Sequence, residues 1–546
     1  MEKQNEQKKN VVKNSLVLSG LLGTAGLFIA KMLGLVYSIP LSSILGSDTL
    51  MSYYGTSYQI YSYILNVFTA GIPFAISTLV AKYTILEDNK ALSKIRTMSL
   101  NLMKILGVFG MLLLILLSGL IAPIVAGKDS QILQISLCIL SLAIFLVPIL
   151  SAYRGFWQGR KEMVEYAFSQ TFEQIFRVGF LLTCAFLIVY VFNMERTYAL
   201  YVAVLSTSIA AIAAIIQIYI FDRKKFKSIK NAAKKQTKRG ERNVVLFKEL
   251  IVLAIPYLLT ATIGYIDAIF NSILLPIGLR MHGYDVAQVD VILSAFNYVG
   301  SKLTSIPQIL APGFIAALIP HITEARIENN RKSISKMITE SIGIVLFIGS
   351  MLSACIAIYA EEIYHILFFT SDIELAANVI RWISVEGFLG TICPVTSSLM
   401  IALGLKRDAI RRQLISAIMK GVTMLPLLYF FGFSGAIISS MIGSTYLLIS
   451  NIIQIDKLYD IYLKHIARDV IKVSIALIAM YVTSIVLTSI GLDGAVGGKF
   501  IAFIKLGINS VVAIVVYFGL SNVLHIPQDL FHRDIFGVIK SKLKRS

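Results

Sequence analysis

The sequence predicts an all-α integral membrane protein of about fourteen transmembrane helices, arranged as two pseudo-symmetric six-helix lobes plus a C-terminal helix pair. Of the 546 residues, 56% are apolar and 15% are charged, which is more apolar surface than a soluble core can bury. The apolar residues fall into runs of roughly 20–30, long enough to cross a hydrocarbon layer of about 30 Å. The basic residues are concentrated in every second loop between these runs. Short alternating segments, typical of an outer-membrane barrel, are absent from the sequence.

The apolar runs set the expected helix bounds. The first six are 15–45, 52–81, 100–126, 131–153, 164–192 and 197–221, and the next six are 249–279, 289–320, 337–360, 374–403, 410–432 and 434–456. The last pair covers 470–491 and 500–524. The expected domains are a first lobe (1–221), a basic cytoplasmic linker (222–248), a second lobe (249–456) and a region with helices 13 and 14 and a basic tail (457–546).

The distribution of basic residues predicts the orientation. Forty of the fifty lysines and arginines lie in, or within about one helical turn of, alternate loops, and four lie in the opposite loops. We therefore expect both termini on the cytoplasmic side of a bacterial inner membrane, and the loop 361–374 outside. The linker carries eleven basic residues. It is either a solvated segment under the positive-inside rule or a site that attracts anionic lipid headgroups.

Composition and spacing exclude several other classes of protein. The net charge of +19 lies in short loops with no nucleic-acid-binding motif, so no nucleic-acid partner is expected. The four cysteines all lie in apolar runs, and neither they nor the six histidines have metal-ligand spacing. We find no phosphate-binding glycine loop, helical His-Glu-x-x-His or nucleophile elbow, so we expect no catalytic residues, metal or cofactor.

A weak repeat relates the two halves. The segment that starts at Ala70 (Ala-Gly-Ile-Pro-Phe-Ala) resembles the one that starts at Ala311 (Ala-Pro-Gly-Phe-Ile-Ala), at an offset near 240. Six helices per half is an even number, which makes the repeat parallel. Substrate is then expected between halves that rock to give alternating access. Proline and glycine bend helices at these places and are either hinges or fixed kinks. The candidates are Gly71, Pro73, Pro307, Pro312 and Gly313.

Charges inside the predicted helices are the candidate site residues, because a charge in the bilayer is costly unless it meets a partner or an aqueous cavity. Lys31 and Lys302 have no acidic residue three or four positions away, and one comes from each half. We expect them to bind an anionic headgroup, although a bridge from Lys31 to Asp267 is an alternative. Arg381 and Lys420 are further cavity candidates.

Glu173 and Arg177 have the i,i+4 spacing of an ion pair on one helix face. We therefore expect them to be a structural pair, with a role in the site as the alternative.

Two segments resemble a known superfamily. The segment 24–35 (Thr-Ala-Gly-Leu-Phe-Ile-Ala-Lys-Met-Leu-Gly-Leu) resembles the first helix of the multidrug/oligosaccharidyl-lipid/polysaccharide exporters. The segment 153–159 (Tyr-Arg-Gly-Phe-Trp-Gln-Gly) looks like the polysaccharide-transporter branch, and within it the chain is most similar to the stage V sporulation protein B and MurJ-type lipid II flippase group. Drug exporters of the superfamily have twelve helices.

This resemblance implies two lobes around a cationic cavity, with helices 13 and 14 forming a groove for a polyprenyl tail. Lys31 and Lys302 match basic positions of the flippases, and Asp267 echoes an ion-coupling position on helix 7. Helix 11 offers no matching carboxylate, which leaves sodium coupling in doubt. The implied function is a non-enzymatic, monomeric flippase for an undecaprenyl-pyrophosphate-linked sugar, with lipid II as the expected cargo and membrane lipids as its surroundings. The alternatives are a flippase for another lipid-linked repeat unit and a cation-coupled multidrug exporter.

Overall fold

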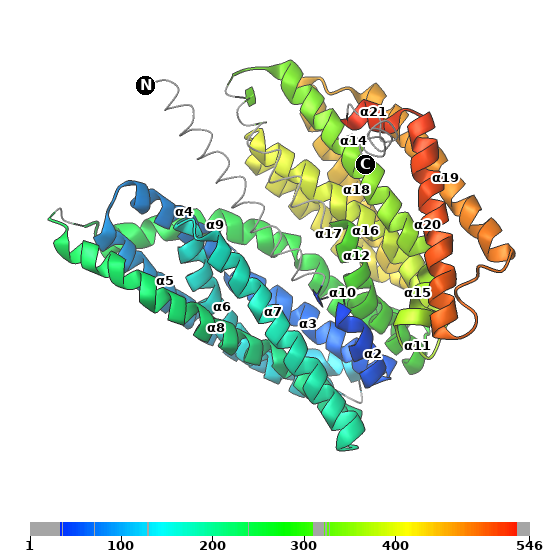
Figure 1. The fold of residues 1–546 in the computed structure, drawn as a ribbon, viewed down its shortest axis with the longest axis horizontal. Helices are drawn as coiled ribbons and strands as arrows, with labels where there is room; N and C mark the ends of the chain where they lie inside the picture. The colour runs from blue at the N-terminus through cyan, green and yellow to red at the C-terminus, as the bar shows by residue number, and fades with distance from the viewer. Residues whose placement is uncertain are drawn as a thin grey trace, which may run out of the picture. The chain divides into compact units, whose positions relative to one another are not determined.

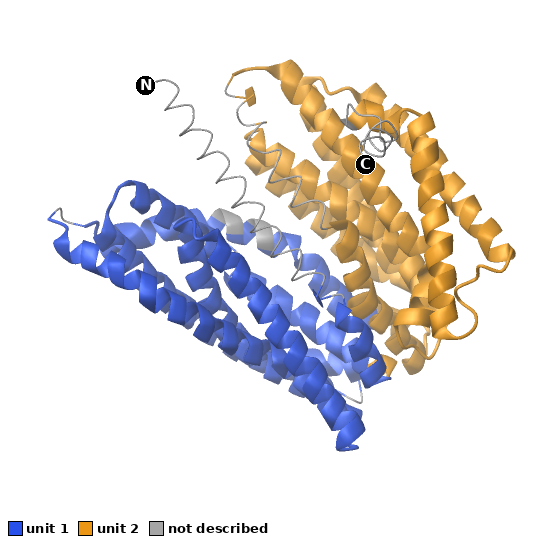
Figure 2. Ribbon diagram, in the orientation of Figure 1, with its two compact units in different colours: residues 1–46, 50–276 blue, residues 47–49, 277–546 orange. Residues whose placement is uncertain are grey.

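The computed structural model describes residues 33–531, except for 35, 70, 128–129, 238–239, 309–321, 323–324 and 327. Every regular element in this part of the chain is a helix. The chain divides into two compact units (Figure 2): unit 1 comprises residues 1–46 and 50–276, and unit 2 comprises 47–49 and 277–546.

Unit 1 is a bundle of long helices in which α5 packs on α6 and both α6 and α7 pack on α8 (Figure 1). Its elements are α2 (Ser38–Leu45), α3 (Asp48–Thr69), α4 (Ile72–Ile85), α5 (Asn89–Ala126), α6 (Ser130–Gly159), α7 (Met163–Phe186), η2 (Leu187–Val191), α8 (Arg196–Lys235), α9 (Asn243–Gly264) and the start of α10 (Ile266–His282). A Cβ on Gly107 of α5 would lie 2.9 Å from the carbonyl oxygen of Phe145, so this glycine is what lets α5 approach the backbone of α6.

Unit 2 is a second bundle, in which α16 contacts α14 and α18, α17 packs on α18, and α19 packs on both α14 and α20. Its elements are α11 (Val286–Leu293), η3 (Ser294–Gly300), α12 (Ser301–Gln308), α14 (Arg331–Ile358), α15 (Ala360–Leu367), α16 (Ile373–Ala402), α17 (Lys406–Phe431), α18 (Phe433–Tyr459), α19 (Leu463–Ser489), α20 (Lys499–Val523) and α21 (Ile526–Phe531).

The predicted fold class is confirmed. Within the described residues, twelve helices are long and apolar enough to cross a membrane. The first predicted helix (15–45) lies mostly outside the described residues, and the eighth (289–320) is described continuously only to Gln308. The count of fourteen therefore stays a prediction.

Three predicted segments differ from the helices observed. The helix predicted at 52–81 is described as α3 and α4, with residue 70 between them outside the described residues, and Pro73 stands in the first turn of α4, where its missing N–H costs no hydrogen bond. The helix predicted at 249–279 is interrupted by a turn at Tyr265. There, Gly264 weakens a helix, and α10 restarts with Asp267 in its first turn, where the helix dipole favours an acid.

The third difference concerns the predicted linker, 222–248. Helix α8 continues through its first half to Lys235, and α9 begins at Asn243. The sequence becomes polar at Asp222, but helix α8 continues because Asp222 and the residues after it still pack against the other helices of unit 1. The boundary between the compact units lies at Pro276, beyond the linker.

Candidate functional site

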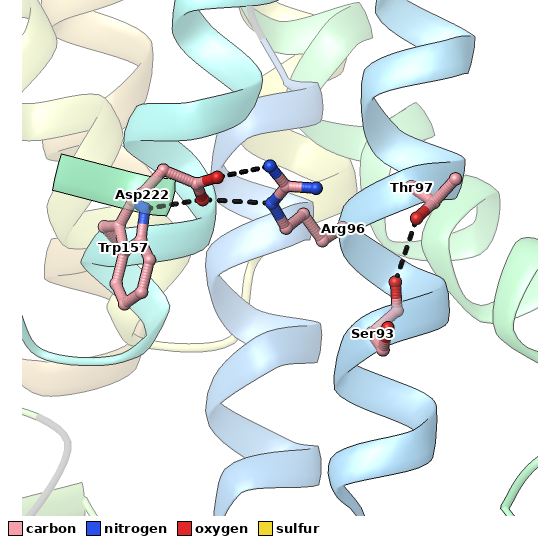
Figure 3. Close-up of polar contacts among 5 residues, drawn as sticks. All are labelled: Ser93, Arg96, Thr97, Trp157 and Asp222. Carbon is pink, nitrogen blue, oxygen red and sulfur yellow. Dashed lines mark hydrogen bonds and ion pairs between the residues drawn. The ribbon is translucent and has the colours of Figure 1, made fainter. Parts of the chain in front are cut away.

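A buried carboxylate joins three helices of unit 1 (Figure 3). Asp222 of α8 is 1% exposed and accepts hydrogen bonds from Arg96 of α5 and Trp157 of α6. Arg96 Nε lies 2.9 Å from Oδ1 of Asp222, its Nη2 pairs with Oδ2, and Trp157 Nε1 lies 3.1 Å from Oδ1. The guanidinium group also lies over the ring of Phe226, 4.2 Å from its centroid. We call these four residues the Arg96 cluster. Each charge in it faces its opposite, so the cluster stabilises the fold.

The segment 153–159 is a packing surface as well as a sequence motif. A Cβ on Gly155 would lie 2.7 Å from the carbonyl oxygen of Pro73, and one on Gly159 would lie 2.5 Å from that of Ser77. Both contacts are with the backbone of α4, which cannot give way as a flexible side chain could. The two glycines, four residues apart on one face of α6, therefore allow α4 to lie directly against it.

Asp88 ties the predicted linker to unit 1. It caps α5 by accepting the N–H of Ala91 at 3.0 Å, and it also accepts from Gln236 Nε2 at 2.9 Å and from the N–H of Glu241 at 3.2 Å. Burial by itself would raise the pKa of this carboxyl, but these hydrogen bonds hold its pKa below the ordinary value. The connection between α8 and α9 is thus held against the turn between α4 and α5.

The ion pair predicted between Glu173 and Arg177 is not the one that the structure forms. Glu173 Oε2 lies 2.8 Å from Nη1 of Arg154, and both side chains are largely buried. Arg154 Nη2 also donates to the carbonyl oxygen of Ser169 at 2.8 Å. The guanidinium group of Arg177 lies instead over the ring of Tyr58, 4.9 Å from its centroid.

Arg154 was not predicted as the partner of Glu173 because its helix was predicted to end too early. The fourth helix was predicted to end at residue 153, which makes Arg154 a loop residue, whereas α6 continues to Gly159. A basic residue about one and a half turns inside a helix end needs a partner, and α7 supplies one. The signal was present in the glycine spacing at Gly155 and Gly159, because close helix packing implies that the helix continues.

The three candidate cations of unit 2 have different surroundings. Lys420 of α17 is 2% exposed, and its Nζ lies 3.6 Å from Glu386 Oε1 of α16. Arg381 of α16 is 39% exposed, and its Nη2 lies 2.9 Å from Glu361 Oε2. Lys302 is half-buried on α12. The carboxylates that face Lys420 and Arg381 reduce what these two cations offer to an anionic headgroup.

The remaining candidates are placed as follows. Asp267 is exposed in the first turn of α10, in unit 1. Gly71 lies between α3 and α4, and Pro307 lies inside α12. Lys31, Pro312 and Gly313 lie outside the described residues. Among the residues that the structure describes, no group of three or more His, Cys, Asp or Glu side chains is arranged to hold a metal ion.

The protein is a multi-pass helical membrane protein, because it consists of two bundles of long apolar helices whose inner charges are matched. Solved structures of membrane transporters share its fold. The chain resembles the structure described as lipid II flippase MurJ in an inward closed conformation, with a TM-score of 0.66 and 15% identity over 92% of this chain and 99% of that one. It also resembles an inward-facing multidrug resistance MATE family transporter of the MOP superfamily, with a TM-score of 0.62 and 16% identity over 79% of this chain and 95% of that one.

The sequence identifies the family. The profile of the polysaccharide biosynthesis protein family matches residues 12–326, more than half of the chain, and the chain belongs to this family. It is 29% identical over 436 residues to lipid II flippase MurJ of Bacillus subtilis (strain 168), covering 77% of this chain and 78% of that protein. It is 23% identical over 419 residues to stage V sporulation protein B of the same organism, covering 76% and 77% of the two chains.

Proposed function

We propose that the protein is a flippase that moves an undecaprenyl-pyrophosphate-linked sugar, with lipid II as the cargo, from the inner to the outer leaflet of the bacterial cytoplasmic membrane by alternating access. The observation that carries this proposal is the similarity to lipid II flippase MurJ, which extends over three-quarters of both chains. A single shared lobe would give a shorter match.

The coverage of the two kinds of solved structure favours a lipid-linked cargo over a drug. The MurJ structure covers 92% of this chain, whereas the MATE structure covers 79% although 95% of its own length is matched. This chain therefore has more residues than the MATE fold accounts for. Helices α19 and α20, which follow the twelve predicted helices of the two lobes, are apolar enough to cross the membrane. A cargo with a long polyprenyl tail needs an apolar surface of the kind that such an additional helix pair provides, whereas a small drug does not.

In this proposal, Lys302 and Lys31 bind the pyrophosphate group. A diphosphate carries about two negative charges at neutral pH, and lysines bind it as mobile point charges that allow release on the far side of the membrane. Arg381 and Lys420, each facing a carboxylate, are further candidates for binding the anionic headgroup. Asp267, in the first turn of α10, is the candidate for ion coupling.

Depletion of the protein in its native cell tests the cargo. Lipid II should accumulate on the cytoplasmic leaflet, measured by extraction and mass spectrometry of polyprenyl-linked sugars with a leaflet-selective enzyme probe. Accumulation of a different repeat unit would replace lipid II by that cargo. Accumulation of no lipid-linked sugar, together with sensitivity to cationic drugs, would favour the multidrug exporter instead.

Substitution tests the residues. Lys31→Ala and Lys302→Ala should each abolish flipping in cells that insert normal amounts of the protein, whereas Lys→Arg should be largely tolerated. Full activity in the well-expressed double alanine variant would remove these lysines from the mechanism.

The proposed orientation has its own test. A cysteine introduced at Asp372 should react with an impermeant reagent added outside the cell, and one introduced at Lys235 should not.

A further inference from the structure

A large pocket lies within unit 2, away from every candidate cation except Arg381. Its volume is about 980 Å³, and it is lined by the end of α14, by α15, α16 and α19, and by the connection between α19 and α20. The proposed orientation places it at the external end of the unit. The polar lining includes three carboxylates, those of Glu361, Glu362 and Asp493, and the guanidinium group of Arg381. We call this the Glu362 pocket.

The rest of the lining is mostly apolar, with a few hydroxyl groups on α19, and extends into the depth of the membrane. Along α19 the lining extends from Ser489 back to Leu477, and a rise of twelve residue steps corresponds to about 18 Å of helix. Ile478 and Tyr481 on this stretch are 62% and 52% exposed, so the wall is open to whatever fills the pocket. A charged end joined to a long apolar wall has the form of a lipid, with a headgroup and a chain.

The carboxylate of Glu362 is the side chain that points to a ligand. It is 8% exposed and lines the pocket, and it accepts a hydrogen bond from its own backbone N–H. Gly494 closes over it, since a Cβ there would lie 3.1 Å from Cγ of Glu362. Burial, followed by the nearby charges of Asp493 and Glu361, raises the pKa of Glu362 above its ordinary value. A cation placed against it would remove the cost of this buried charge.

The charges of the pocket do not balance. Arg381 faces Glu361 at 2.9 Å, and Asp493 accepts the N–H of Ala495 at 2.8 Å, so a single guanidinium group stands against three carboxylates in the pocket lining. Among the described residues, no group of three or more His, Cys, Asp or Glu side chains is arranged to hold a metal ion. An ammonium group supplies both the charge and the hydrogen-bond donors that a carboxylate accepts.

We propose that the Glu362 pocket binds a membrane phospholipid whose headgroup carries a primary ammonium group. The ammonium group lies against Glu362 and Asp493, the phosphate lies on the side of Arg381, and an acyl chain follows the wall formed by α14 and α19. This lipid is a resident of the outer leaflet and is not the transported cargo. The inference does not depend on which substrate the protein moves.

Lipid retention from bilayers of defined composition tests the proposal. The full-length protein is placed in nanodiscs of phosphatidylglycerol that contain equal amounts of phosphatidylethanolamine and phosphatidylcholine, and native mass spectrometry counts the lipids that stay bound. The primary amine should be retained roughly tenfold over the trimethylated amine, the factor expected from one charge-assisted hydrogen bond. Equal retention of the two lipids, or preferred retention of phosphatidylglycerol, would overturn the proposal. This comparison uses the wild-type chain alone and needs no variant to fold.

Variants then locate the site. Glu362→Gln with Asp493→Asn keeps the shape of the pocket and removes two negative charges, so it should abolish the preference for the primary amine. Glu374→Gln is the matched control, because Glu374 is an exposed acid in the first turn of α16 and does not line the pocket. A preference that survives the double substitution, or that Glu374→Gln removes equally, would assign the lipid to another surface. Loss of flipping with an unchanged lipid preference would concern the proposed function only.

Discussion

The Arg96 cluster of unit 1 and the Glu362 pocket of unit 2 are both groups of buried charges, but they are completed differently. In the cluster, Asp222 is 1% exposed and is hydrogen bonded by both Arg96 and Trp157. In the pocket, Glu362 is 8% exposed, and three carboxylates face one guanidinium group. A buried charge is tolerated when its partner is present and is costly when it is absent. The comparison teaches that the cluster is complete within the fold, whereas the pocket is completed from outside.

The largest expected effect concerns the complete cluster. Asp222→Asn leaves the buried guanidinium group of Arg96 without its counter-charge and should destabilise the protein by about 3–5 kcal/mol. Thermal unfolding in detergent, followed by fluorescence-detected gel filtration, measures the loss. The control is Glu162→Gln, because Glu162 forms an exposed pair with Lys225 at 2.8 Å that contributes at most about 1 kcal/mol. Equal shifts in the two variants would contradict a special role for the Arg96 cluster.

The second effect tests the packing that holds the cluster together. Gly159→Ala should destabilise unit 1 by roughly 1–3 kcal/mol, because its Cβ would overlap the backbone of α4. Gly179→Ala is the matched control in α7, since nothing lies within 4 Å of the position that its Cβ would take. That control should be neutral or slightly stabilising, as expected for alanine in a helix. If both alanine variants unfold at the wild-type temperature, α4 and α6 are farther apart than described.

A third, smaller effect concerns Asp88, whose carboxylate is completed by backbone and side-chain donors. Asp88→Asn keeps a side-chain oxygen that can cap α5 but removes the negative charge that strengthens the hydrogen bonds, so it should cost about 1 kcal/mol at neutral pH. The folded-state pKa of Asp88 is lowered, so its contribution is present above the unfolded-state pKa and disappears as the pH falls through the folded-state value. The difference in unfolding temperature between wild type and variant should therefore shrink on acidification below about pH 4. A difference that stays constant to low pH would show that the charge of Asp88 contributes nothing.

The smallest expected effect is a gain in stability instead of a loss. It tests most directly how the Glu362 pocket differs from the Arg96 cluster. In detergent without added phospholipid, Glu362→Gln should leave the protein as stable as wild type or stabilise it by a few tenths of a kcal/mol, because it removes a buried charge from a lining in which three carboxylates face one guanidinium group. The folded-state pKa of Glu362 is raised, so wild-type stability is full below the unfolded-state pKa and falls as the pH rises through the folded-state value. The variant should lose this pH dependence. A clear destabilisation by Glu362→Gln would mean that the pocket already contains the partner of this carboxylate.

The sequence by itself determined the class of the protein and most of its spans. Hydropathy is a local property, so each apolar run could be assigned to a helix before its neighbours were known, and twelve such helices are present among the described residues. The two short segments 24–35 and 153–159 indicated the family. In the fold, the glycines of 153–159 lie against the backbone of α4, and its tryptophan donates a hydrogen bond to Asp222.

The pairing of charges was decided only by the tertiary structure. Spacing along one helix predicted a Glu173–Arg177 pair, yet Glu173 meets Arg154 from the neighbouring helix. Asp222 looked like the start of a solvated linker and is instead buried against α5 and α6. The i,i+4 pairing along a helix contributes only about 0.2–0.5 kcal/mol, whereas a buried charge without a partner costs several times more. The partner is therefore chosen by which helices lie side by side, and a single sequence does not state that.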